Sequence, residues 1–358
     1  MSEIRKHYFL ADYCIIAEGR AKRPSDFVFE QPEMGPRASS PGSESKLTSE
    51  PVASSPLSLS CVFCAGNEGR TPPASVVYKD GTLFEEGAER VQDWDVRCFP
   101  NIYPALSPAP PPTHSPAFPP IPAFSGLQGF RCEAVPGFGF HEVIVESPVH
   151  GRNLEVFSDG ELRLLMRVYR DRVAHYRQHE KIRYVSLFKN FGKAAGASLE
   201  HSHSQLLALP LLPPLFEKEL QAIRALDRCP YCAVLETEIR AERLILENRD
   251  CIAFAPYCSK VPFEVWILPK KHVCSLETCS EDLLFSLGDM LRAIVSKYRE
   301  KLMGPAYNCM FHLSESPEYH LSLRLIPRLS LPAGFELNTG IYINTVSPER
   351  AASCLREI

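Results

Sequence analysis

The chain has 358 residues, a formal net charge of −4 and 13 cysteines. This charge provides no electrostatic attraction for nucleic acid, and no apolar run is long enough to span a bilayer, so we exclude nucleic-acid and membrane partners. Residues 1–10 are charged and lack the apolar core of a signal peptide. We therefore expect a cytoplasmic protein whose cysteines are free thiols or metal ligands.

The first part of the chain alternates ordered segments with irregular ones. Residues 7–18 predict an opening hairpin or strand pair. The cations Arg20 and Arg23 follow it, either in a solvated turn or as a clamp for phosphate. Residues 32–60 are rich in Ser, Pro and Glu, and residues 104–122 are rich in Pro. Both segments are predicted to be irregular inserts.

Two Cys-x-x-Cys pairs stand out, at Cys61 and Cys64 and again at Cys229 and Cys232. This spacing turns two thiols toward one point, as a metal knuckle requires, although redox pairs share it. A second pair in the same chain favours metal binding.

A strand, a helix and a further strand follow the first knuckle. Residues 141–150 predict a strand that ends in a proline-containing turn at His150. Residues 161–180 carry apolar side chains at helical spacing, and residues 182–188 predict another strand. This order is typical of an α+β fold in which helices cover one face of a sheet.

The motif that organises the chain follows a turn of small residues at 192–198. His201, His203 and Gln205 alternate with other residues, as in a strand with all three on one face. One imidazole can bind a metal while the other attacks an electrophile or carries a proton, and the Gln amide can hold a phosphoryl oxygen. The alternative is a pair of hydrogen-bonded core histidines.

The second half of the chain repeats this order. Its predicted elements are helices at 216–226 and 281–301 and strands at 252–256, 263–272, 307–313 and 319–327. We therefore predict two halves, residues 1–210 and 211–358, each an antiparallel sheet with packed helices and related by an internal repeat.

The repeat lacks part of the motif. His203 and His320 each precede a proline by seven residues. When the halves are aligned on these prolines, Glu318 and Ser322 replace the first histidine and the glutamine. We therefore predict one reactive centre per chain, in the first half.

Each half offers two cysteines and two histidines in the same order. The first set is Cys61, Cys64, His150 and His201; the second is Cys229, Cys232, His272 and His320. Such sets match closed, tetrahedral, structural zinc sites. Scattered thiols would leave the repeated order unexplained.

These stretches resemble the galactose-1-phosphate uridylyltransferase family of the histidine-triad superfamily. The resemblance covers most of the chain outside the two inserts. It is carried by residues 19–24, 61–67, 147–150, 189–190, 196–198, 201–205, 262–264 and 334–336.

The resemblance implies a ping-pong transfer in which His203 attacks the α-phosphorus of a nucleotide sugar. Gln205, Ser198 and the backbone of Gly196 would stabilise the phosphoryl oxygens. Further family positions that bind the nucleotide are Arg20, Arg23, Asn101 and Asn190. Glu336 matches a position that holds the hexose, in some members from the other subunit of a homodimer.

The default reaction is transfer of UMP from UDP-glucose to galactose 1-phosphate. Ser202 and Ser204 stand where well-known bacterial members have Pro and Gly, and the second Cys/His set also differs from theirs. These features, with residues 340–344, resemble plant-like ADP-glucose phosphorylases, which makes AMP transfer to phosphate the alternative. A hydrolase or nucleotide-binding protein is disfavoured because an amide at Gln205 cannot carry protons. A zinc-stabilised interaction module is the last alternative.

Overall fold

The computed structural model describes residues 3–6, 13–16, 61–87, 89–109 and 138–357. The strands of the first half are β3 (Val76–Lys79), β4 (Thr82–Phe84), β5 (Val96–Pro100), β6 (Phe140–Val145), β7 (Tyr184–Phe191) and β8 (His203–Leu209). Those of the second half are β9 (Leu244–Glu247), β10 (Cys251–Phe254), β11 (Val265–Pro269), β12 (Tyr307–His312) and β13 (Ser322–Pro327).

Within the described residues these eleven strands form a single sheet, in the order β4-β3-β5-β6-β8-β7-β12-β13-β11-β10-β9. The order β5-β6-β8-β7 is mirrored by β10-β11-β13-β12, and every pairing in the two sets is antiparallel. The internal repeat and the α+β class are therefore confirmed. Strands β7 and β12 pair with each other, Asn190 opposite Asn308, and join the halves into one sheet. The division into domains at residue 210 stays a prediction.

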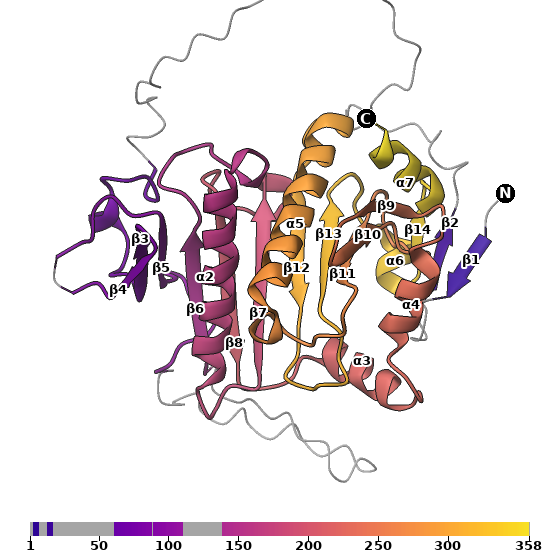
Figure 1. The fold of residues 1–358 in the computed structure, drawn as a ribbon, viewed down its shortest axis with the longest axis horizontal. Helices are drawn as coiled ribbons and strands as arrows, with labels where there is room; N and C mark the ends of the chain where they lie inside the picture. Colours follow the sequence, from indigo (N-terminus) through magenta and orange to yellow (C-terminus); the bar gives the residue numbers. More distant parts are fainter. Residues whose placement is uncertain (1–2, 7–12, 17–60, 88, 110–137, 358) are drawn as a thin grey trace, which may run out of the picture.

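One long helix connects the inner strands of each half: α2 (Asp159–Arg177) and α5 (Glu281–Lys301). They lie side by side across one face of the sheet (Figure 1). Gly288 permits their close approach, because a Cβ there would lie 2.8 Å from Cγ of Met166. Of the helices in the described ranges, none combines the length and apolarity that crossing a membrane requires.

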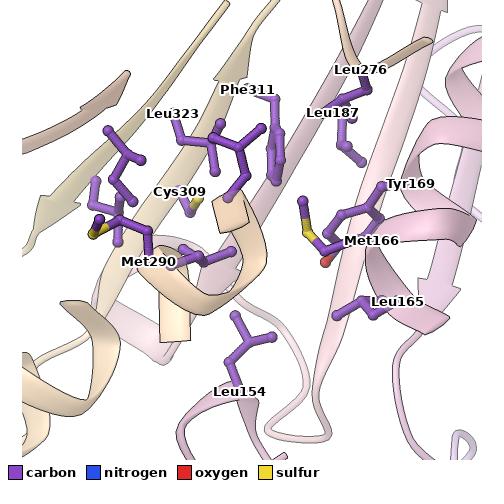
Figure 2. Packing of buried hydrophobic residues seen from close by; sticks show 14 of the residues in the cluster. Leu154, Leu165, Met166, Tyr169, Leu187, Leu276, Met290, Cys309, Phe311 and Leu323 are labelled. Atoms are coloured by element: carbon purple, nitrogen blue, oxygen red, sulfur yellow. The ribbon is translucent and has the colours of Figure 1, made fainter. Parts of the chain in front are cut away.

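The main core lies between these helices and the sheet. Figure 2 shows Met166 and Tyr169 of α2 pointing toward Cys309 and Phe311 of β12. The Tyr169 and Phe311 rings meet edge to face, with centroids 5.3 Å apart. Helices on one face leave the other face of the central strands for the functional groups described below.

Smaller elements complete the chain. They are α3 (Pro214–Arg224), α4 (Pro230–Glu238), α6 (Gly334–Thr339), α7 (Pro348–Arg356) and a sheet of β1 (Glu3–Lys6), β2 (Tyr13–Ile16) and β14 (Tyr342–Asn344). The predicted opening hairpin thus begins earlier than expected, at residue 3, and β2 also pairs with the C-terminal β14. Residues 104–109 form no helix or strand, as predicted. The insert at 32–60 and residues 110–122 lie outside the described residues.

Candidate active site and metal centres

The first Cys/His set forms one cluster. Nδ1 of His201 lies 3.7 Å from Sγ of Cys61 and 3.5 Å from Sγ of Cys64, and Nδ1 of His150 lies 3.6 Å from Cys64. All four ligand atoms lie within 4.8 Å of one another. Sulfur and nitrogen ligands of one tetrahedral zinc ion would be separated by about 3.6 Å, given the usual bond lengths. The cluster therefore has the size and donor set of a closed metal site.

The tautomer of His201 suits this role. Its Nε2–H donates to the carbonyl oxygen of Ser147 at 2.7 Å, so the lone pair of Nδ1 faces the thiols. Burial lowers the pKa of His201 to about 4 and raises the pKa of Cys64 to about 11. A bound cation would offset the second effect, because it stabilises the thiolate.

The second set repeats this geometry at the start of α4. Nδ1 of His320 lies 3.9 Å from Sγ of Cys229 and 3.6 Å from Sγ of Cys232, and Nδ1 of His272 lies 3.4 Å from Cys232. The Nε2–H groups donate to backbone carbonyls, that of His320 to Pro269 at 3.0 Å. Both predicted ligand sets are thus brought together as two closed clusters.

The second cluster corrects the alignment of the two halves. His320 takes the place of His201 and not that of His203, so Ser322 corresponds to His203 and Arg324 to Gln205. The two prolines only mark where the strands end. Counted from the histidine of the Cys/His cluster, β13 reaches its proline two residues sooner than β8 does, so the alignment on prolines was wrong. The conclusion that the second half lacks the motif is unchanged.

His203 is the first residue of β8, whereas His201 lies in the bend before it. The prediction that all three motif residues share one strand face was therefore wrong for His201, which lies in the first Cys/His cluster. Gln205 follows on the same face as His203, and Ser204 points into the core, where its hydroxyl contacts Tyr169 at 2.7 Å.

His203 presents one free nitrogen. Its Nδ1–H donates to the carbonyl oxygen of His201 at 2.8 Å, so Nε2 carries the lone pair. No group in the described part of the chain hydrogen-bonds to Nε2. The side chain is 5% exposed, and burial lowers its pKa, although the bond to His201 opposes this. The imidazole is therefore neutral near pH 7 and can act as a nucleophile.

A buried ion pair supports the strand from the other side. Nζ of Lys189 lies 2.6 Å from the carboxylate of Glu146 and donates to the backbone oxygen of His203 at 3.3 Å. The hydroxyl of Ser202 donates to the same carboxylate at 2.6 Å. Burial alone would raise the pKa of Glu146, but Lys189 and the hydroxyls hold it below its usual value. Sequence reasoning gave Glu146 no role.

Asn190 provides a hydrogen-bond donor next to His203. Phe188 of β7 pairs with Gln205, so Asn190, two residues further along, reaches the level of His203. Its Oδ1 accepts from Nδ2 of Asn308 at 2.7 Å, and its NH2 group has no partner among the residues that the structure describes. Asn308 was missed, because only the pairing of β7 with β12 brings it here.

Gln205 and Asn101 are held in a similar manner. Nε2 of His141 lies 2.8 Å from Oε1 of Gln205, and Oδ1 of Asn101 accepts from the backbone N–H of Tyr103 at 2.8 Å. Among the described residues the NH2 group of Gln205 therefore has no hydrogen-bond partner, whereas Nδ2 of Asn101 lies 3.3 Å from Nε2 of His141. The sequence analysis gave His141 no role, because a polar residue that alternates with apolar ones such as Val143 is common in an ordinary strand.

The other predicted residues are placed differently. Gly196 (φ +86°) lies in the small-residue turn beside Asn190, and Ser198 is exposed at the end of the same turn. Glu336 lies on α6, beside β14 and separated from β8 by β7, β12 and β13 (Figure 1). A single chain does not bring it to His203. Arg20 and Arg23 lie outside the described residues.

Comparisons with known proteins agree with this site. Residues 85–213 match the family "Galactose-1-phosphate uridyl transferase, N-terminal domain", and residues 158–356 match a domain of unknown function, DUF4921. ADP-glucose phosphorylase of Arabidopsis thaliana is 32% identical over 99% of this chain and 93% of its own length. Galactose-1-phosphate uridylyltransferase of Thermotoga maritima is 31% identical over 76% and 87%.

Among solved structures, an ADP-glucose phosphorylase from Arabidopsis thaliana with bound ADP-glucose has a TM-score of 0.76 at 30% identity. The alignment covers 100% of this chain and 99% of that one. The fold and these relatives therefore define a nucleotidyltransferase. The chain belongs to the galactose-1-phosphate uridylyltransferase family, as its motifs predicted.

Proposed function

We propose that the chain transfers a nucleotidyl group from a nucleotide sugar through a covalent intermediate on His203. The observation that carries this proposal is the fixed tautomer, in which Nδ1–H is bound to His201 and the Nε2 lone pair has no hydrogen-bond partner in the described ranges. In the first step Nε2 attacks the α-phosphorus, and the bond from phosphorus to the sugar-phosphate oxygen breaks. The sugar 1-phosphate leaves with that electron pair.

The leaving group needs no proton from the protein, because the second pKa of a phosphate monoester lies at about 6. Positive charge develops on the imidazole of His203 as the bond between Nε2 and phosphorus forms. The carbonyl oxygen of His201 accepts the Nδ1–H bond throughout and stabilises that charge. This explains why a glutamine, which cannot transfer protons, suffices two residues after the nucleophile.

Negative charge develops on the non-bridging phosphoryl oxygens during the attack. The free NH2 groups of Asn190 and Gln205 are donors for these oxygens, and both are fixed before substrate arrives. Donors held in place in this way stabilise a transition state without reorganisation. In the second step an acceptor phosphate oxygen attacks the α-phosphorus and releases Nε2.

For the substrates, we propose ADP-glucose as donor and inorganic phosphate as acceptor. Support comes from the Arabidopsis phosphorylase, which aligns over nearly the whole of both chains. The two motif serines that resemble the plant-like members, Ser202 and Ser204, both donate to the carboxylate of Glu146. Transfer of UMP from UDP-glucose to galactose 1-phosphate is the second candidate, favoured by the Thermotoga relative and the matched N-terminal domain.

The test is to incubate the enzyme with each donor and each acceptor in all four combinations and to identify the products. The expected result is ADP and glucose 1-phosphate from ADP-glucose and phosphate, with His203→Ala as inactive control. UDP-galactose from UDP-glucose and galactose 1-phosphate, without reaction of ADP-glucose, would instead establish the uridylyltransferase. Steady hydrolysis without acceptor would contradict both.

We further propose that zinc fills both Cys/His clusters as a structural ion. All four ligands of each cluster are protein side chains, so no position is left for substrate. The first cluster would hold His201 and thereby the carbonyl that orients the nucleophile. The remaining family positions keep their predicted roles: Arg20 and Arg23 on phosphate, and Glu336 on the hexose across a homodimer.

A further inference from the structure

We propose that His141 is a positioning residue that selects the amide orientation of Gln205, so that Gln205 presents its NH2 group and not its oxygen to the substrate phosphate. The identity of the substrate phosphate rests on the proposed function. The hydrogen-bond geometry that selects the orientation does not.

The argument begins with the backbone N–H of Ala105. It donates to Nδ1 of His141 at 3.1 Å, so Nδ1 must carry a lone pair. Burial also lowers the pKa of His141, which keeps the ring neutral near pH 7. The single ring proton is therefore on Nε2.

Nε2–H then determines how Gln205 lies. It donates to Oε1 of Gln205 at 2.8 Å. In the flipped amide, the NH2 group would face Nε2–H, donor against donor. Nδ2 of Asn101 lies 3.3 Å from the same nitrogen, but its own oxygen is held by Tyr103, so Asn101 offers no alternative acceptor.

This selection has a direct chemical consequence. An amide that rotates freely can turn its oxygen toward the phosphoryl oxygens, where the two negative ends repel each other. With Oε1 bound to His141, Gln205 can only donate. His141 would thus act on the reaction through Gln205, without touching the substrate.

His141 also anchors the loop at Ala105, and substitutions can separate the two tasks. Asparagine places its oxygen at the same bond separation from Cα as Nδ1, so His141→Asn keeps the acceptor for Ala105 and loses the donor. Glutamine places its nitrogen at the same separation as Nε2, so His141→Gln keeps the donor. His179, whose ring lies tilted against that of Phe140 with centroids 4.6 Å apart, is the control histidine.

The first readout is the single-turnover rate of His203 nucleotidylation. We expect His141→Asn to lower this rate about 10-fold or more with little change in KM, and His141→Gln to retain most of it. His179→Ala should match the parent. In a Gln205→Ala background, His141→Asn should lower the rate less than about twofold, because the two residues act as a unit. An equal loss in both backgrounds would overturn the proposal.

The second readout needs no activity. Nuclear magnetic resonance of isotope-labelled histidine nitrogens reports which ring nitrogen of His141 carries the proton. We expect the Nε2–H tautomer, with a resonance that shifts in Gln205→Ala but not in His179→Ala. An Nδ1–H tautomer would overturn the proposal. Because this measurement requires no turnover, it distinguishes failure of the positioning role from failure of the proposed function.

Discussion

The ring of Phe63, inside the first metal knuckle, lies edge-on to the imidazole of His203, with centroids 5.3 Å apart and planes at 67°. Nδ1–H of His203 is fixed by His201, and Phe63 restricts the ring from the side. The metal knuckle therefore contacts the nucleophile directly, and its position bears on the angle at which Nε2 meets the substrate.

We expect Phe63→Ala to retain both metal ions and to lower the rate of His203 nucleotidylation about 10-fold, since small misplacements of a reacting group are costly. Phe63→Leu should be intermediate. Val62→Ala, a change in the same knuckle, should leave the rate unchanged. An unaltered rate in Phe63→Ala would show that His201 alone orients the nucleophile.

Elemental analysis should find about two zinc ions per chain, one for each closed set of ligands. Cys229→Ser should lose one ion and lower the melting temperature but keep the ability to label His203. Cys61→Ser should lose one ion and the labelling, because His201 is then free to move. Cys354→Ser, outside both clusters, is the control. Normal labelling by a Cys61→Ser protein that has lost its metal would separate that cluster from the reaction.

The buried pair of Glu146 and Lys189 should be sensitive to removal of one partner. Lys189→Met leaves a buried carboxylate without its counter-charge, and we expect a loss of about 3–5 kcal/mol in unfolding free energy by urea titration. The double variant Glu146→Gln/Lys189→Met should recover much of this. Arg249→Met, which removes exposed ion pairs with Asp250 and Asp282, should leave the unfolding free energy almost unchanged. A small effect of Lys189→Met would mean that water reaches the pair.

Glu161 stabilises the first turn of α2, and this stabilisation depends on pH. Arg152 and the Ser158 cap lower its pKa from 4.5 to about 2. The contribution of ionised Glu161 to the free energy of unfolding is therefore complete above pH 4.5 and is lost as the pH falls toward 2. Glu161→Gln should cost about 1 kcal/mol near pH 7, after allowing for solvent at this half-exposed pair, and the difference should shrink in acid. Glu180→Gln, just beyond the helix, should show no such trend.

Much of the site could be predicted because its motifs are short stretches of sequence and because the order of cysteines and histidines occurs in both halves. Cys-x-x-Cys places two thiols together in any fold, and the repeated order of cysteines and histidines predicted which side chains form the two Cys/His clusters. The alternation from His203 to Gln205 predicted their common face. The helix at 161–180 was recognised from its apolar spacing, which packing on the sheet requires, and the helix at 281–301 was recognised from the internal repeat.

The rest depends on contacts between distant residues. His141 acquires its role only where β6 lies beside β8, and Asn308 only where β12 pairs with β7. The alignment of His320 with His203 failed because membership of a Cys/His cluster, and not distance from the end of a strand, shows which residues of the two halves correspond. Short strands such as β4, all of whose residues are exposed, carry no hydrophobic pattern to recognise.

The central claim is that His203 carries the nucleotidyl group between the two half-reactions. The most direct test is the intact mass of the protein after brief incubation with ADP-glucose, and separately with UDP-glucose, without acceptor, followed by peptide mapping. The account predicts one AMP per chain, attached at His203, absent in His203→Ala and released by phosphate. Full turnover by His203→Ala, or a label on another residue, would contradict it.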